Sequence, residues 1–281
     1  MSQNGNTMVA AARAGDIVTL QKLIGEGVNV DERSEDGLTA LMAAAVAANA
    51  AVDFLLSKKA DINARDSDSR TIIKLTLDAG HKDLAQSFVD RFPDLIITDP
   101  RLPKGADWLR DQFAKVSANI QDDASKPRPA LLDRLLSLEL GPVEGRDVSD
   151  VYWEHIFLRY IGDIPLDIQR NYSETLVLSL VGTFNVILHG HAGIRKSGQL
   201  LNGELPTTQY DIVGTVIMPA GSWVTERWGY YDVVNVRQVV DGIDTFLIEG
   251  GKIKVKMINY NVEKHVDSRE DYEKKVGLRS G

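Results

Sequence analysis

The sequence predicts an all-α repeat array at the N-terminus, followed by a C-terminal α+β domain in which a curved antiparallel sheet wraps on helices. Three observations predict this arrangement. Similar segments return at a regular interval through the first third of the chain. The middle has a helical pattern that is broken by a polar stretch with prolines. The last part places helical segments first and strand-like runs last, which is typical of an α+β fold.

Composition narrows the class of protein. The 281 residues favour two domains, and they are 43% hydrophobic and 26% charged, as in ordinary globular proteins. A formal net charge of −8 argues against nucleic-acid and anionic-membrane partners. Cysteine is absent, which excludes disulfides and thiolate metal sites. The first ten residues lack the pattern of a secretory signal, and no apolar run approaches the roughly 18 residues of a membrane span, so we expect a cytoplasmic protein.

The repeat is marked by Thr7, Thr39 and Thr71, which fall at successive intervals of 32 residues. Around them the chain reads GNTMVAAARAG, GLTALMAAAVA and SRTIIKLTLDAG. Small alanines let the first helix of each repeat lie close to its neighbour, and leucine pairs on a second helix cover the core between repeats. Gly25 and Gly27 suit the turn after that helix, where a positive φ favours glycine.

These segments resemble the ankyrin repeat over about residues 4–95. The usual T-P-L-H start is absent, because the first two copies read TMVA and TALM, which fits a short array with atypical ends. The resemblance implies a face that binds a protein partner. The alternative is a scaffold that only covers or dimerises the second domain. We assign residues 1–95 to this array.

Residues 96–147 predict a helical connector. The segment 105–120 has apolar residues at helical spacing, and the polar stretch 121–130 interrupts it. A second apolar helix begins at Pro129, and GPVEGRD ends it. We interpret this region as packing helices with two hinges.

The α+β domain spans residues 148–264, and a charged tail of residues 265–281 follows it. Helical patterns cover 150–161, a short segment after Gly162, and 194–205. Strand-like patterns cover 176–181, 209–218, 222–236 and 238–249, and Gly250-Gly251 closes a hairpin into the run 253–264. Lys254 and Lys256 alternate with apolar residues, which predicts that they lie on a solvated or interface face.

Three segments of this domain resemble a known superfamily: YIGDIPLDIQRNYSE, LHGHAGI and DGIDTFLIEGGKIKVKMINYNV. In order and spacing they are similar to the nuclear transport factor 2-like superfamily, in particular its SnoaL-like branch of polyketide cyclases and ketosteroid isomerase-like proteins. The resemblance implies a cystatin-like cone with an apolar, ligand-binding pocket at its open end, and a homodimer formed through the sheet. It leaves open both isomerase, cyclase or dehydratase activity and non-catalytic binding.

The resemblance also implies catalytic residues. His155 falls where a helix residue supplies an oxyanion donor, and Asp244 matches, to within a residue, a second donor in the form of a protonated acid. A neutral acid in an apolar interior can donate a hydrogen bond to a developing enolate. The general base of that pattern falls at Ser179 or Leu180, and neither can remove a carbon-bound proton. His189 and His191 flank Gly190 and are candidate substitute bases, with His191 as the main candidate; the alternative is that they are ordinary loop and capping residues.

Other residues are candidates for lining a ligand site. Glu226 and Trp228 share one face of their strand, as do Ile258 and Tyr260 on the last strand. The full set of candidate ligand-binding residues is Tyr172, Glu226, Trp228, Phe246, Ile258 and Tyr260. Aromatic residues in such positions more often belong to a core, and this alternative stays open.

The sequence predicts no metal and no cofactor. The histidines are scattered, and His189-Gly190-His191 in a turn is too little for a metal site. GTFNVILHG lacks the lysine and the spacing of a phosphate loop. Two functions remain: a binding protein whose cone holds a small hydrophobic ligand or dimerises while the repeats bind a partner, and a cofactor-independent isomerase, cyclase or dehydratase acting on a hydrophobic carbonyl substrate.

Overall fold

The computed structural model describes residues 3–95, 97–205, 210–218 and 222–278. The chain divides into two compact units. Unit 1 comprises residues 1–108 and 161–164, and unit 2 comprises residues 109–160 and 165–281. The domain boundaries expected after residues 95, 147 and 264 stay predictions.

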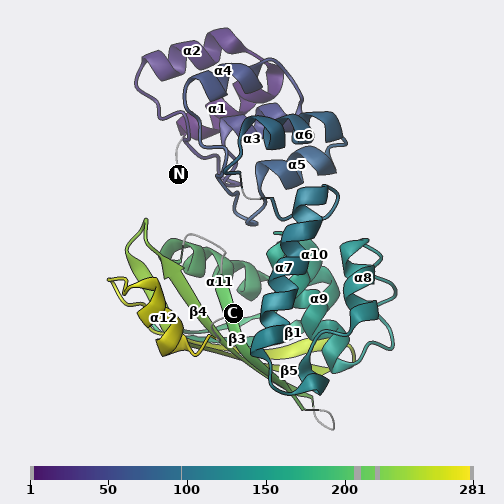
Figure 1. Ribbon diagram of the computed structural model, residues 1–281. Helices are drawn as coiled ribbons and strands as arrows, with labels where there is room; N and C mark the ends of the chain where they lie inside the picture. Colours follow the sequence, from purple (N-terminus) through teal and green to yellow (C-terminus); the bar gives the residue numbers. More distant parts are fainter. Residues whose placement is uncertain (1–2, 96, 206–209, 219–221, 279–281) are drawn as a thin grey trace. The chain divides into compact units, whose positions relative to one another are not determined.

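Unit 1 is built from pairs of helices (Figure 1). They are α1 (Gln3–Ala14), α2 (Ile17–Gly25), α3 (Ala40–Val46), α4 (Ala51–Ser57), α5 (Ile72–Asp78) and α6 (Lys82–Arg91). The first helices of successive repeats contact each other, α1 with α3 and α3 with α5. The second helices α2, α4 and α6 each pack on the first helix of their own repeat. Helices therefore recur along the chain with the period that the sequence predicts.

The threonines that mark the period have two different roles. Thr39 and Thr71 are the N-caps of α3 and α5, where their hydroxyls accept from the N–H groups of Met42 and Lys74. Thr7 lies inside α1 instead, and its hydroxyl donates to a backbone carbonyl one turn earlier. The first repeat therefore starts its helix before the threonine, as an atypical end repeat.

The core of unit 1 is made largely of small side chains. Ala12, Ala43 and Ala44 are buried between the stacked helices, beside Leu20 and Phe88. Alanine keeps the helix axes close, and it loses no side-chain entropy when the helix forms. The predicted packing role of the alanines agrees with this core.

Three further helical segments follow the repeats: α7 (Pro103–Asn119), the short 3-10 turn η1 (Asp123–Ser125) and α8 (Pro129–Leu136). Pro129 begins α8 as the sequence predicts. Phe113 of α7 is fully buried, and its ring stands edge-on to Trp153 at 6.1 Å. Nowhere in the described part of the chain is a helix both long and apolar enough to cross a membrane.

Unit 2 contains a six-stranded sheet with the strand order β2-β1-β6-β5-β4-β3. Its strands are β1 (Tyr172–Val181), β2 (Asn185–His189), β3 (Tyr210–Ile217), β4 (Trp223–Asp232), β5 (Arg237–Glu249) and β6 (Lys252–Asn259). Its further helices are α9 (Val148–Tyr160), α10 (Ile164–Asn171), α11 (Gly190–Glu204) and α12 (Arg269–Val276).

The sheet is mixed, so the prediction of a wholly antiparallel sheet is wrong at one pair. β1 and β6 pair in parallel, whereas the other neighbouring strands pair antiparallel. A parallel pair needs a long crossover connection, and the chain between β1 and β6 supplies one. A sequence pattern indicates a strand but not the direction of its neighbour, which explains the error.

Two elements were not expected from the sequence. β2 alternates exposed and half-buried residues, so it lacks the apolar run that marks β1. α12 lies in the charged tail, where Ser268 caps its first turn. Tyr272 and Val276 of α12 are fully buried although their neighbours are charged, so two apolar residues one turn apart dock this helix.

Alternation along β4 separates the two faces of the sheet. Glu226 points toward α9, because it is hydrogen-bonded to Tyr152 of that helix. Gly229 and Tyr231 point the other way, toward Tyr272 of α12: the two tyrosine rings lie 4.8 Å apart, and a Cβ on Gly229 would lie 2.4 Å from the Tyr272 hydroxyl. We call the side toward α9 the inner face and the side toward α12 the outer face.

Candidate functional site

Polar side chains gather on the inner face of the sheet and on the helices that cover it. They come from α9, α10 and five of the six strands, and all but Arg159 are buried. Burying so many polar groups in one place costs free energy unless they satisfy one another. We call this set the inner polar network: Tyr152, His155, Arg159, Asp167, Tyr172, Thr215, Glu226, Trp228, Asp244 and Lys256.

Glu226 is the acid at the centre of β4. One of its carboxylate oxygens accepts a hydrogen bond from the hydroxyl of Tyr152, which also lies 3.1 Å from the hydroxyl of Thr215. Its other oxygen, Oε1, makes no hydrogen bond or ion pair with the described residues. Burial raises the pKa of Glu226 to about 7, and the negative charge of Asp244 acts in the same direction. Glu226 therefore exchanges a proton near neutral pH.

Asp244 is the direct cross-strand partner of Glu226. One of its oxygens accepts from Trp228 Nε1 at 2.7 Å, and the other lies 3.2 Å from Lys256 Nζ. The lysine nitrogen also lies 4.8 Å above the ring of Phe246. Both oxygens of Asp244 thus have a donor group nearby, and its role as an oxyanion donor stays a prediction. Burial lowers the pKa of Lys256, but the electrostatic contributions of the nearby Tyr172 and of the Asp244 carboxylate outweigh burial and raise that pKa overall.

His155 forms a second polar centre with Asp167 of α10. Its Nδ1 lies 2.9 Å from the carboxylate of Asp167, which also accepts from Arg159 at 2.7 Å and from Asn171 at 3.0 Å. Burial lowers the pKa of His155 to about 4, although Asp167 opposes this, so the imidazole is neutral at pH 7. Since the carboxylate accepts, we assign the single ring proton to Nδ1. Nε2 is then an acceptor without a partner in the described chain.

Burial raises the pKa of Asp167, but the contacts with His155 and Arg159 outweigh burial and lower this pKa overall.

The proposed ligand-lining residues lie around the two polar centres, the one at Glu226 and Asp244 and the one at His155 and Asp167. Tyr172 stands edge-on to His155 at 5.5 Å between ring centroids, and the ring of Phe246 lies at the same distance on another side. Both rings are fully buried.

The remaining lining candidates lie on β4 and at the end of β6. Ile258 is the cross-strand partner of Asp244. Tyr260 lies 5.9 Å from Trp228 between ring centroids, and its hydroxyl donates to Glu204 at 3.0 Å. The predicted lining set is therefore brought together on one face, and its role in binding stays a prediction.

His191 is not part of the inner polar network. It lies in the first turn of α11, half-buried, and its Nε2 lies 3.2 Å from the backbone carbonyl of Tyr172. A carbonyl oxygen only accepts, so Nε2 is the donor in this contact. The role of His191 as a base stays a prediction.

Lys256 was expected on a solvated or interface face, and the solvated alternative is wrong. Lys256 is buried, and its side chain faces inward with Asp244. The register between β5 and β6 shifts between Leu247 and Ile248, which places both Ile253 and Lys256 on the inner face although strict alternation would separate them. A bulge of this kind leaves no signal in the residue pattern. Tyr152, Arg159 and Asp167 were also missed, because each looks like an ordinary polar position on an amphipathic helix.

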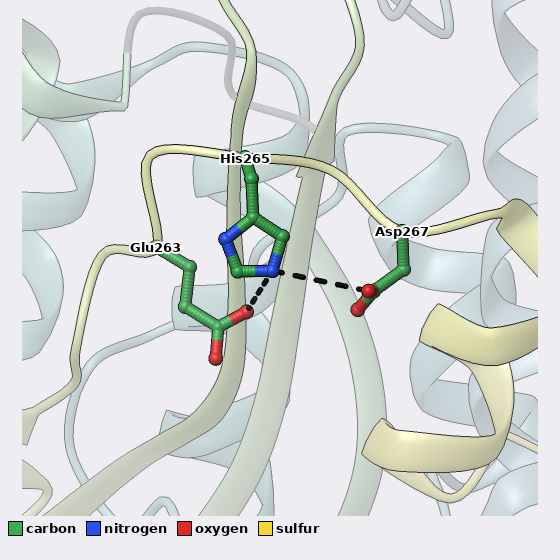
Figure 2. Close-up of side chains that lie close together, drawn as sticks. All are labelled: Glu263, His265 and Asp267. Carbon is green, nitrogen blue, oxygen red and sulfur yellow. Dashed lines mark ion pairs between the residues drawn. The ribbon is translucent and has the colours of Figure 1, made fainter.

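A group that could hold a metal ion lies in the loop after β6 (Figure 2). Glu263, His265 and Asp267 offer ligand atoms within 4.8 Å of one another. His265 Nε2 lies 3.4 Å from Glu263 and 3.8 Å from Asp267. Both carboxylates already accept from the side-chain amide of the fully buried Gln238, and Lys275 pairs with Asp267. These contacts explain the cluster as an anchor that holds the loop against β5.

Comparison with protein families identifies the N-terminal part of the chain. Residues 7–99 match the model of ankyrin repeats in 3 copies, which confirms the predicted repeats. Ankyrin repeats indicate protein–protein interaction. A search of curated proteins finds no significant match to the chain.

Proposed function

We propose that the chain is a two-part binding protein, in which the ankyrin repeats hold a protein partner and unit 2 holds a small, largely apolar molecule against the inner face of the sheet. The site consists of Glu226 and Asp244 as polar contacts, with Trp228, Phe246 and Ile258 as the apolar wall. Tyr172 and Tyr260 extend that wall at either end.

The observation that carries this proposal is that Glu226 is buried without a cationic partner among the described residues. Glu154, a buried acid of α9, has two arginine partners, Arg146 at 2.8 Å and Arg170 at 2.7 Å. Glu226 is equally enclosed, has no cation in contact among the described residues, and faces the like charge of Asp244 across the strand pair. Such an acid destabilises the fold, and groups kept despite this cost cluster at functional sites.

The proposal also includes the cone and the superfamily that the sequence resembles. In support, α9 contacts β4 and β5, α11 contacts β1 and β2, and the sheet curves around them (Figure 1). A concave sheet closed by helices is a common site for small ligands. The polar groups on its inner face would then fix the orientation of a mainly apolar ligand.

We further propose that the outer face forms a homodimer. Large apolar side chains remain exposed on it, on each of the six strands: Val177, Val181, Ile187, Val216, Trp223, Ile243 and Met257. In strand register, Ile187, Ser179, Met257, Thr245, Thr225 and Val216 form one row across all six strands, in which apolar residues are interspersed with serine and threonine. Exposed apolar side chains that gather on one face of a sheet are typical of an interface.

Sedimentation velocity of the full chain tests the dimer. We expect the wild-type chain to sediment as a dimer and Met257→Lys to sediment as a monomer. Val234→Lys is the matched control, because Val234 is 90% exposed but lies in the β4–β5 turn, away from the row. A monomeric wild-type chain contradicts the dimer.

Native mass spectrometry of the full chain tests the ligand site. We expect the purified chain to retain a small apolar molecule, and Ile258→Trp to lose it because the larger ring fills the inner face. Val234→Trp is the control, because Val234 is 90% exposed in the β4–β5 turn, away from both the inner face and the row of outer-face residues. A wild-type chain that is empty and binds none of a library of apolar fragments contradicts the proposal.

A second candidate function is a cofactor-independent isomerase, cyclase or dehydratase acting on a hydrophobic carbonyl substrate. Glu226 favours it, because a carboxyl group with a pKa of about 7 suits acid–base work at neutral pH, and it supplies the carboxylate that Ser179 and Leu180 lack. The test is exchange of the α-protons of benzylacetone with deuterated water. Glu226→Gln should slow it about 100-fold, and exposed Glu249→Gln should not.

A further inference from the structure

The charges of the inner polar network do not balance. Its carboxylates are Asp167, Glu226 and Asp244, whereas its cations are Arg159 and Lys256. Arg159 lies 2.7 Å from Asp167, and Lys256 lies 3.2 Å from Asp244. Glu226 is thus the acid of the network without a cation in contact among the described residues.

The groups that face Glu226 offer it no positive charge in contact. Tyr152 and Tyr160 face it from α9, Thr215 from β3 and Asp244 from β5. Lys256 of β6 acts on it only at longer range and is paired with Asp244. Glu226 is more than nine-tenths buried, and its Oε1 makes no hydrogen bond or ion pair with the described residues.

The same interior already holds one ammonium group in a defined way. Lys256 Nζ lies beside the carboxylate of Asp244 and 4.8 Å above the ring of Phe246. Glu226 has comparable surroundings, because the ring of Tyr152 lies 5.6 Å from Phe246 and Trp228 is on the same face of β4. Carboxylate and aromatic ring are therefore both present at Glu226, while the cation is missing.

We propose that the ligand of unit 2 carries a protonated nitrogen on an apolar body, and that this nitrogen pairs with Oε1 of Glu226. The ligand class is an organic ammonium ion, and the inference rests on the proposed ligand site. Such a ligand completes the charge balance of the network and separates Glu226 from the like charge of Asp244.

The alternative ligand class makes the opposite prediction about pH. A cation binds the ionised form of Glu226, so its affinity rises as the pH increases through 7 and binding releases a proton. A carbonyl compound would instead accept a hydrogen bond from the protonated acid, so its affinity would fall over the same interval.

The probes are phenylbutylamine, benzylacetone and butylbenzene, which share an apolar body and differ in the polar group. We expect the amine to bind the full chain most tightly by ligand-observed NMR. Its affinity should rise about tenfold from pH 6 to pH 8, because the ionised fraction of a group titrating near pH 7 rises by that factor. Glu226→Gln should weaken the amine at least tenfold and remove its pH dependence, while exposed Glu174→Gln on β1 should change neither.

The other possible results contradict either the ammonium ligand alone or the ligand site as well. Benzylacetone or butylbenzene binding as tightly as the amine, or an amine affinity that Glu226→Gln leaves unchanged, overturns the ammonium ligand and leaves the ligand site standing. No binding of any probe overturns both. Glu226→Asp guards against a folding defect in the glutamine variant, since it keeps the charge and should keep the preference for the amine.

Discussion

The two units bury polar side chains in different ways. In unit 1 the buried threonines bond within their own turn of chain: Thr39 caps a residue three positions away, and the hydroxyl of Thr76 binds a carbonyl four positions away. Buried Lys74 also pairs with the distant Asp163 at 2.9 Å. In unit 2 the bonds join distant segments, with 74 positions between Tyr152 and Glu226 and 105 between Arg146 and Gly251. Local polar bonds complete secondary structure, whereas long-range bonds hold a site together.

The largest expected effect is on the long-range polar bonds of unit 2, and removal of the Asp167 carboxylate tests it. Asp167→Ala leaves Arg159 without its carboxylate and takes away the partner of His155. We expect the free energy of unfolding to fall by about 3–5 kcal/mol, as for other broken buried ion pairs. Urea denaturation measures it, with exposed Glu174→Ala as the control. A loss below about 1 kcal/mol would mean that the network does not depend on this pairing.

Removal of the charge of Glu226 is expected to stabilise the fold, whereas removal of Asp167 destabilises it. Its pKa is about 7 in the folded chain against 4.5 for the free side chain, so the folded state keeps a proton that the unfolded state has released between these values. Stability therefore falls as the pH rises from 4.5 to 7 and stays level above that.

Glu226→Gln removes this loss. At pH 8 the variant should be more stable than the wild-type chain by on the order of 3 kcal/mol, and at pH 4 the two should be nearly equal. Calorimetric unfolding at both pH values measures the difference, with exposed Glu249→Gln as the control. A wild-type chain that is the more stable of the two at pH 8 would show that ionised Glu226 supports the fold and is not retained for a ligand.

The smallest expected effect is a difference in stability between alanine variants of two threonines, Thr39 and Thr7, that occupy the same position of the repeat. Thr39→Ala should lower the free energy of unfolding by about 1 kcal/mol, because α3 loses its N-cap. Thr7→Ala should change it by only a few tenths of a kcal/mol, since Thr7 lies inside α1 and alanine favours a helix. Urea denaturation of both variants distinguishes the two. Equal losses would mean that Thr7 also caps a helix.

The sequence was informative wherever a contact is local or periodic. The period of 32 predicted the repeats, Pro129 predicted the start of α8, and Gly250-Gly251 predicted the β5–β6 hairpin. It was uninformative about β2, whose residues are only partly buried, and about α12, where two buried residues are hidden among charges. Pattern reading depends on a continuous apolar face, and neither element has one.

The residues of the candidate site likewise fall into those that the sequence pattern predicted and those that it did not. Alternation along β4 and β6 was enough to group Glu226 with Trp228 and Ile258 with Tyr260 on shared faces. It gave no sign that Lys256 turns inward, because a register shift between strands is invisible in either strand alone. The parallel pairing of β1 with β6 was hidden for the same reason.

The sequence by itself determined the repeat array, most of the secondary structure and the residue types that line the inner face. Only the tertiary structure decided which acid stands without a cation: it brings Tyr152 to Glu226, Lys256 to Asp244 and Arg159 to Asp167. The physical reason is that a helix cap or a turn is closed by neighbours in the chain. A buried charge, in contrast, is balanced or left unbalanced by groups that only folding brings within a few ångströms.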